Sequence, residues 1–89
     1  MTGKERAAFR AAANSLNAIQ QIGHGGINEE FVKNTDAALK ARELIKMKVL
    51  ETSPVTAREA ANILAAQLEA EVIQVIGRCF VLYRENPDK

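Results

Sequence analysis

Three glycines within four residues form the most unusual motif of this 89-residue sequence, Gly23-His24-Gly25-Gly26. Asn28 follows, and asparagine commonly caps the first turn of a helix. A glycine loop that leads into a helix presents unpaired backbone amides and the positive end of the helix dipole, and no side chain obstructs a close ligand. The motif therefore indicates a site for a phosphate group, although a tight strand-to-helix turn without a ligand would use the same residues.

The residues after the glycines exclude two common nucleotide-binding motifs. A P-loop needs Lys and Ser or Thr after its last glycine, and here Ile27 and Asn28 follow. The dinucleotide fingerprint GxGxxG needs a glycine where Asn28 stands. Glu29 and Glu30 would also weaken the binding of a highly charged nucleotide. We therefore expect no small-molecule cofactor at this loop.

The other reactive side chains do not form a catalytic or metal-binding set. One histidine and one cysteine are too few for a zinc site. Cys79 has only Arg78 as a guaranteed basic neighbour, so we interpret it as a structural cysteine. Small sulfur-carrier proteins of similar fold place their cysteine in a Cys-Pro motif before a helix, and that motif is absent. His24 would need a partner to act as a general base, so we expect no enzymatic activity.

Basic side chains are the remaining candidates for ligand contacts, and most lie in the first half of the chain. Residues 1–48 hold eight basic and five acidic residues, whereas residues 49–89 hold four and six. Any single surface lysine or arginine is more often a solvated charge. We predict that Arg10, Lys46 and Lys48 form one basic face with the glycine loop. The full set considered for phosphate contacts is Lys4, Arg6, Arg10, Lys40, Arg42, Lys46, Lys48, Arg78 and Arg84.

Composition limits the class of protein further. Eighty-nine residues suffice for one small domain, and an apolar content of 47% is too high for a disordered chain. The aromatic content of 4% argues against modules that stack successive bases, and a net charge of +1 argues against a nonspecific polycationic binder. We predict a single domain over residues 1–89.

The chain shows no sign of export. A single cysteine cannot form an internal disulfide, which favours a reducing compartment. The uncharged stretch over residues 11–28 contains several polar residues and glycines, so it fits neither a signal peptide nor a membrane span. We predict a soluble, cytoplasmic protein.

Start signals predict three helices. Capping boxes at Thr2–Glu5 and Thr56–Glu59 predict helices over about residues 3–15 and 57–68, and Asn28 predicts one over about 28–41. The predicted inward residues of the first helix are Phe9, Ala12, Ala13 and Leu16. Those of the last helix are Ala60, Ile63, Leu64 and Leu68.

Four strands are predicted between and after these helices, over about residues 17–22, 44–50, 72–76 and 79–84. In the second, Ile45, Met47 and Val49 alternate with Lys46 and Lys48, which gives the strand one apolar and one basic side.

Gly77-Arg78 predicts a type II′ hairpin turn between the last two strands. In that register Val75 faces Phe80 and Ile73 faces Leu82. We expect the first helix or a partner to cover part of the opposite face, which carries Val72, Gln74, Ile76, Cys79, Val81 and Tyr83.

The predicted element order is αβαβαββ. This order implies a two-layer α/β (α+β) fold with three helices and a four-stranded mixed sheet. Right-handed crossovers make the sheet largely parallel, and one antiparallel hairpin strand closes it.

Five segments occur in order over nearly the whole chain: TGKER at 2–6, IGHGGIN at 22–28, ELIKMKV at 43–49, VIGR at 75–78 and VLYR at 81–84. Together they resemble the YhbY-type CRM domain family. The resemblance implies a fold similar to the C-terminal domain of translation initiation factor three, and a GxxG loop that contacts RNA. It also implies association with precursors of the large (50S) ribosomal subunit.

One departure from the family pattern lies in the loop. Many relatives carry lysine or arginine where this sequence has His24, and histidine is largely uncharged at neutral pH. RNA affinity is therefore expected to be weaker or more pH-dependent than the family pattern implies.

The sequence thus predicts a protein that binds structured RNA, specifically large-subunit ribosomal RNA during ribosome assembly. Ribosomal proteins are further possible partners. Three alternatives are a docking module that uses Val72, Ile76, Val81 and Tyr83, a sulfur-carrier-like protein, and an Alba-like nucleic-acid binder. The predicted RNA-binding residues are Gly23, His24, Gly25, Gly26, Lys4, Arg6, Arg10, Lys46, Lys48, Arg78 and Arg84.

Overall fold

All three helices begin at the capping residues that the sequence predicts. The computed structural model describes residues 2–86 and contains α1 (Gly3–Ala13), α2 (Glu29–Arg42) and α3 (Ala57–Leu68). The Glu59 amide donates to Thr56 Oγ1 at 3.1 Å, and the Glu5 amide donates to Thr2 Oγ1 at the same distance. These side-chain acceptors satisfy amides that the first turn of a helix leaves unpaired. The predicted end of the first helix was two residues too late.

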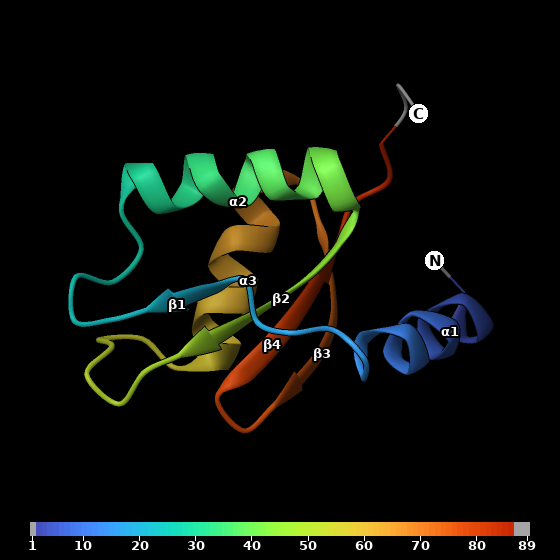
Figure 1. Cartoon of the computed structure of the whole chain (residues 1–89), viewed down its shortest axis with the longest axis horizontal. Helices are drawn as coiled ribbons and strands as arrows, with labels where there is room; N and C mark the ends of the chain where they lie inside the picture. Colours follow the sequence, from blue (N-terminus) through green and yellow to red (C-terminus); the bar gives the residue numbers. More distant parts are fainter. Residues whose placement is uncertain (1, 87–89) are drawn as a thin grey trace.

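The four strands form one mixed sheet in the order β1-β2-β4-β3, as Figure 1 shows. They are β1 (Gln20–Ile22), β2 (Leu44–Val49), β3 (Glu71–Ile76) and β4 (Cys79–Tyr83). The predicted element order and mixed sheet are confirmed. However, β4 lies between β2 and β3, so two of the three strand pairings are antiparallel and only β1 and β2 pair in parallel. The prediction of a largely parallel sheet holds for strand direction but not for strand pairing.

The hairpin turn is confirmed, but part of its register was wrong. Gly77 has φ of +57° and Arg78 does not have a positive φ, which is the sign pattern of a type II′ turn. Val75 pairs with Phe80 as predicted. A β-bulge then inserts one residue, so Val72 rather than Ile73 pairs with Leu82.

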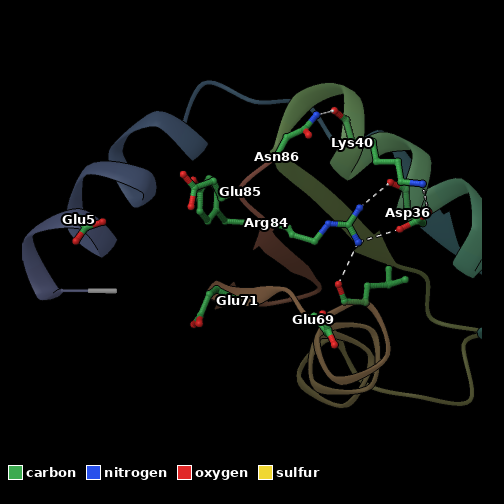
Figure 2. A pocket seen from close by; sticks show the side chains of 10 residues that line it. Glu5, Asp36, Lys40, Glu69, Glu71, Arg84, Glu85 and Asn86 are labelled. Atoms are coloured by element: carbon green, nitrogen blue, oxygen red, sulfur yellow. Dashed lines mark hydrogen bonds and ion pairs between the residues drawn. The ribbon is translucent and has the colours of Figure 1, made fainter. Parts of the chain in front are cut away.

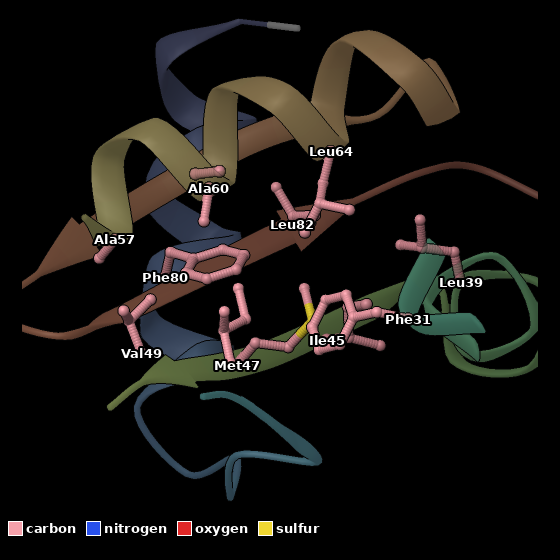
Figure 3. Close-up of a cluster of buried hydrophobic side chains, with 12 residues drawn as sticks. Phe31, Leu39, Ile45, Met47, Val49, Ala57, Ala60, Leu64, Phe80 and Leu82 are labelled. Carbon is pink, nitrogen blue, oxygen red and sulfur yellow. The ribbon is translucent and has the colours of Figure 1, made fainter. Parts of the chain in front are cut away.

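The main core lies between one face of the sheet and helices α2 and α3 (Figure 3). The predicted apolar side of β2 is confirmed, because Ile45, Met47 and Val49 are all buried. On α3, Ile63 was predicted to point inward but is 38% exposed, and Ala57 and Ala61 are buried in its place. The buried residues of this cluster are Ile22, Phe31, Leu39, Ile45, Met47, Val49, Ala57, Ala60, Ala61, Leu64, Phe80 and Leu82.

Helix α1 packs against the other face of the sheet, apart from α2 and α3 (Figure 1). Ala13 of α1 is buried with Ile73 and Val81, and the ring of Phe9 stacks on Tyr83 with centroids 4.1 Å apart. The expectation that the first helix covers part of this face is therefore confirmed. Ala12, which was predicted to be buried, is exposed.

The end of this second face near the hairpin turn stays open, because Ile76 is 63% exposed. Among residues 2–86, no helix is long and apolar enough to cross a membrane.

Candidate nucleic-acid interface

The glycine loop is a compact turn between β1 and α2. The Gly26 amide donates to the Gly23 carbonyl oxygen at 3.0 Å, which leaves His24 and Gly25 exposed at the tip of the turn. The chain then reaches Asn28, whose side-chain oxygen accepts the Phe31 amide at 2.8 Å. The loop therefore presents its tip to solvent immediately before a capped helix N-terminus, where the helix dipole favours negative charge.

Folding requires glycine at only one of the two last loop positions. Gly26 has φ of +66°, and a Cβ atom there would lie 3.1 Å from Pro54 Cγ. Gly25 has no such left-handed φ, and a Cβ atom there would meet nothing within 4 Å. A tight turn explains Gly26 but leaves Gly25 unexplained, whereas a ligand that approaches the tip closely would explain Gly25.

The parallel pairing of β1 with β2 brings lysines beside this loop. Gln21, two residues before the loop, is the register partner of Lys48. The Leu50 amide also donates to the Ile22 carbonyl oxygen at 2.9 Å, so the end of β2 lies beside the start of the loop. Lys46 precedes Lys48 by two residues and lies on the same face of the sheet, about 6.6 Å away along the strand. The structure thus brings Lys48 next to the loop, and Lys46 lies in line with Lys48 along β2.

The predicted basic residues of α1 lie on the same side of the sheet as these lysines. Lys4 and Arg10 are both exposed on this helix, which packs on the face opposite the main core.

The sequence of this chain matches the model of a known protein family. Residues 1–84 match the CRS1 / YhbY (CRM) domain. The chain belongs to the CRM domain family. It is 36% identical over 88 residues to the Bacillus subtilis protein named "Probable RNA-binding protein YqeI", a match that covers 99% of this chain and 92% of that protein.

A second relative and a solved structure agree with this assignment. A Haemophilus influenzae protein named "RNA-binding protein" is 28% identical over 88 residues, covering 99% of this chain and 89% of the relative. The solution structure of the hypothetical protein SAV1595 from Staphylococcus aureus superposes with a TM-score of 0.80 at 42% identity, covering 97% of this chain and 90% of that one. The CRM fold is thereby established for this chain.

Three arginines that were predicted from the sequence as RNA contacts form ion pairs within this CRM domain. Arg84 is the most enclosed: its guanidinium lies 2.8 Å from Asp36 Oδ1, donates to the Leu68 carbonyl at 3.0 Å, and has a side chain only 21% exposed. Arg6 donates to the Val72 carbonyl oxygen and forms an ion pair with Glu71 of β3 at 3.4 Å. Arg78 pairs with Glu51 at 3.0 Å, but both side chains are more than half exposed, so this pair is weak and can exchange for a ligand.

A large acidic cavity surrounds Arg84 (Figure 2). Its volume is about 930 Å³. The hydrogen bond from Arg84, helped by Lys40, lowers the pKa of Asp36 although partial burial opposes this shift. Burial raises the pKa of Tyr83, and nearby glutamates add to the effect. Carboxylates that line the cavity are Glu5, Asp36, Glu69, Glu71 and Glu85.

The acidic cavity is a poor site for phosphate, because its carboxylates outnumber its cations and Arg84 is already neutralised by Asp36. This cavity could not be predicted from the sequence, since Asp36 and Arg84 are 48 residues apart and no local pattern links them.

Proposed function

We propose that this CRM domain binds structured RNA through the tip of the glycine loop together with Lys46 and Lys48. The observation that carries the proposal is Gly25, an exposed glycine that neither its φ nor any neighbouring atom requires. The names of the relatives support RNA as the ligand. Lys4 and Arg10 remain predicted peripheral contacts.

The RNA is proposed to be large-subunit ribosomal RNA in assembling particles, and the site of action the cytoplasm. The low aromatic content supports a grip on the phosphate backbone rather than on stacked bases. Such a domain acts by binding, and we infer no catalytic role.

The decisive experiment measures the affinity of Gly25→Asp for transcripts of large-subunit ribosomal RNA by filter binding. The new carboxylate has room in the fold but repels phosphate, so binding should be lost while the thermal midpoint stays within about 2 °C of the wild type. Gly3→Asp is a matched control: it adds the same charge at another glycine whose Cβ position is open, at the start of α1. The control should bind as the wild type does.

Two outcomes would contradict the proposal. Wild-type affinity of Gly25→Asp would remove the loop from the interface, and unfolding of Gly25→Asp would make the loop purely structural. Crosslinking in cells, followed by sequencing of the attached RNA, tests the ribosomal assignment separately. Crosslinks confined to other RNAs would overturn that assignment and leave RNA binding intact.

The docking alternative has less support. Of its four residues, Val81 is buried and Tyr83 stacks on Phe9. Val72 packs against the main core, on the other face from the one predicted, and Ile76 is 63% exposed. Because α1 occupies most of that face, a partner would find one isoleucine beside the turn rather than an apolar surface.

A further inference from the structure

A second cavity lies under the connection between α1 and β1. It has a volume of about 590 Å³ and is closed on one side by residues 15–19 and on the other by the first half of β2 and the end of α2. Its polar lining comes from Ser15, Asn17, Arg42 and Lys46. The Ser15 hydroxyl donates to the Ala12 carbonyl at 2.9 Å, whereas the Asn17 carboxamide offers N–H donors.

The charge of this cavity is the reverse of the acidic one. Both of its ionisable lining residues are cations, Arg42 and Lys46, and no carboxylate lines it. Among residues 2–86, neither cation forms an ion pair within 4 Å. Two unneutralised cations that share one concave, partly enclosed site attract an anion more strongly than isolated surface charges do.

The position of the cavity links it to the glycine loop. Lys46 lines the cavity and is followed on the same face by Lys48, which lies beside Gln21 of β1. The loop begins two residues after Gln21, at Gly23. Lys46 and Lys48 therefore place two cations along β2, between the cavity and the start of the glycine loop.

We propose that the Arg42–Lys46 cavity binds a phosphate group of the RNA backbone, as a second anchor beyond the glycine loop. The inference rests on the proposed function and deepens it, since it fixes the path of the strand along β2. Arg42 supplies a planar set of donors that can hold two phosphate oxygens, and Lys46 supplies a point charge beside them.

The first test compares Arg42→Gln with Lys40→Gln on a fluorescein-labelled transcript of large-subunit ribosomal RNA. Both variants remove one exposed cation from the last turn of α2, but Lys40 lines the acidic cavity and pairs with Asp36 at 3.3 Å. Arg42→Gln should weaken binding about tenfold and reduce the slope of log affinity against log salt by roughly 0.7–0.9. Lys40→Gln should leave that slope unchanged.

A second test needs no variant. Amide resonances of residues 15–19 in the ¹⁵N-labelled wild-type protein should shift when the transcript is added. Shifts produced by inorganic phosphate but not by the transcript would show a free-anion site and overturn the RNA assignment. An unchanged salt slope in Arg42→Gln, with Gly25→Asp still unable to bind, would overturn the second anchor alone. Failure of the wild-type protein to bind the transcript would instead overturn the proposed function.

Discussion

A Cβ atom at Gly26 would lie 3.1 Å from Pro54 Cγ, so the loop before α2 and the loop before α3 meet at this glycine. Gly26 also has φ of +66°. Gly26→Ala should therefore destabilise the domain by about 1–2 kcal/mol, from the left-handed backbone alone. Gly25→Ala should be neutral or slightly stabilising, because its Cβ position is open and its φ is ordinary.

Urea unfolding of the two alanine variants measures this difference. Equal losses of stability at both positions would contradict the division of the loop into a structural glycine and a ligand-facing glycine.

Arg84 was predicted from the sequence as an RNA contact, but its ion pair with Asp36 indicates a structural role. Arg84→Gln removes charged hydrogen bonds to Asp36 and to the Leu68 carbonyl, and should cost about 1–3 kcal/mol of stability. The salt slope of RNA binding should stay at the wild-type value, because this guanidinium faces the acidic cavity. A reduced slope in a folded Arg84→Gln protein would return the residue to the interface.

The same pair predicts how stability depends on acid. The pKa of Asp36 is lowered below its usual 3.8 in the folded protein, chiefly by the hydrogen bond from Arg84. Because the folded-state pKa is depressed, the carboxylate stabilises the fold above the unfolded-state pKa, and this contribution is lost as the pH falls through the folded-state value. The stability difference between wild type and Asp36→Asn should therefore be largest near pH 6 and shrink below pH 4.

Urea unfolding of both proteins between pH 6 and pH 2.5 measures that difference. A stability difference that stays constant over this range would show that the titration of Asp36 does not cause the loss of stability in acid.

Sequence predicted the features that depend on neighbouring residues. The capping boxes were predicted correctly because each depends on two residues only three positions apart. Thr56 and Glu59, for example, accept hydrogen bonds from each other's backbone amides. The two faces of β2 were correct because a strand alternates by geometry. The place of the glycine loop was also predicted correctly, because a strand end and the Asn28 helix cap lie on either side of it.

Two features that depend on distant residues were not predicted. The bulge places Ile73 against Ala13 of α1, so packing across 60 residues rather than the turn decides the register. The Arg42–Lys46 cavity exists only because residues 15–19 lie beside the end of α2 and the first half of β2. No periodicity within one segment reveals such a juxtaposition.

Packing of α1 gives a further prediction. Phe9 stacks on Tyr83 at 4.1 Å and supports the small cluster around Val81. Phe9→Ala should therefore destabilise the domain by about 1–3 kcal/mol, from the lost aromatic pair and the cavity that remains. Ala12→Ser, on the exposed side of the same helix, should change stability by less than about 0.5 kcal/mol. Similar losses in both variants would mean that α1 is held by its helicity rather than by this contact.

Replacing His24 with arginine is expected to raise the affinity for RNA. His24 lies exposed at the tip of the loop, where the charge of an arginine would lie near the phosphate that we propose to bind beside Gly25. His24→Arg should steepen the salt slope by roughly 0.7–0.9, the value for one added phosphate contact, and strengthen binding at low salt. The same substitution in the Gly25→Asp background should give no gain if the loop tip is the contact site. A gain of equal size in that background would show that the new arginine acts by general attraction, and that RNA does not approach the tip closely.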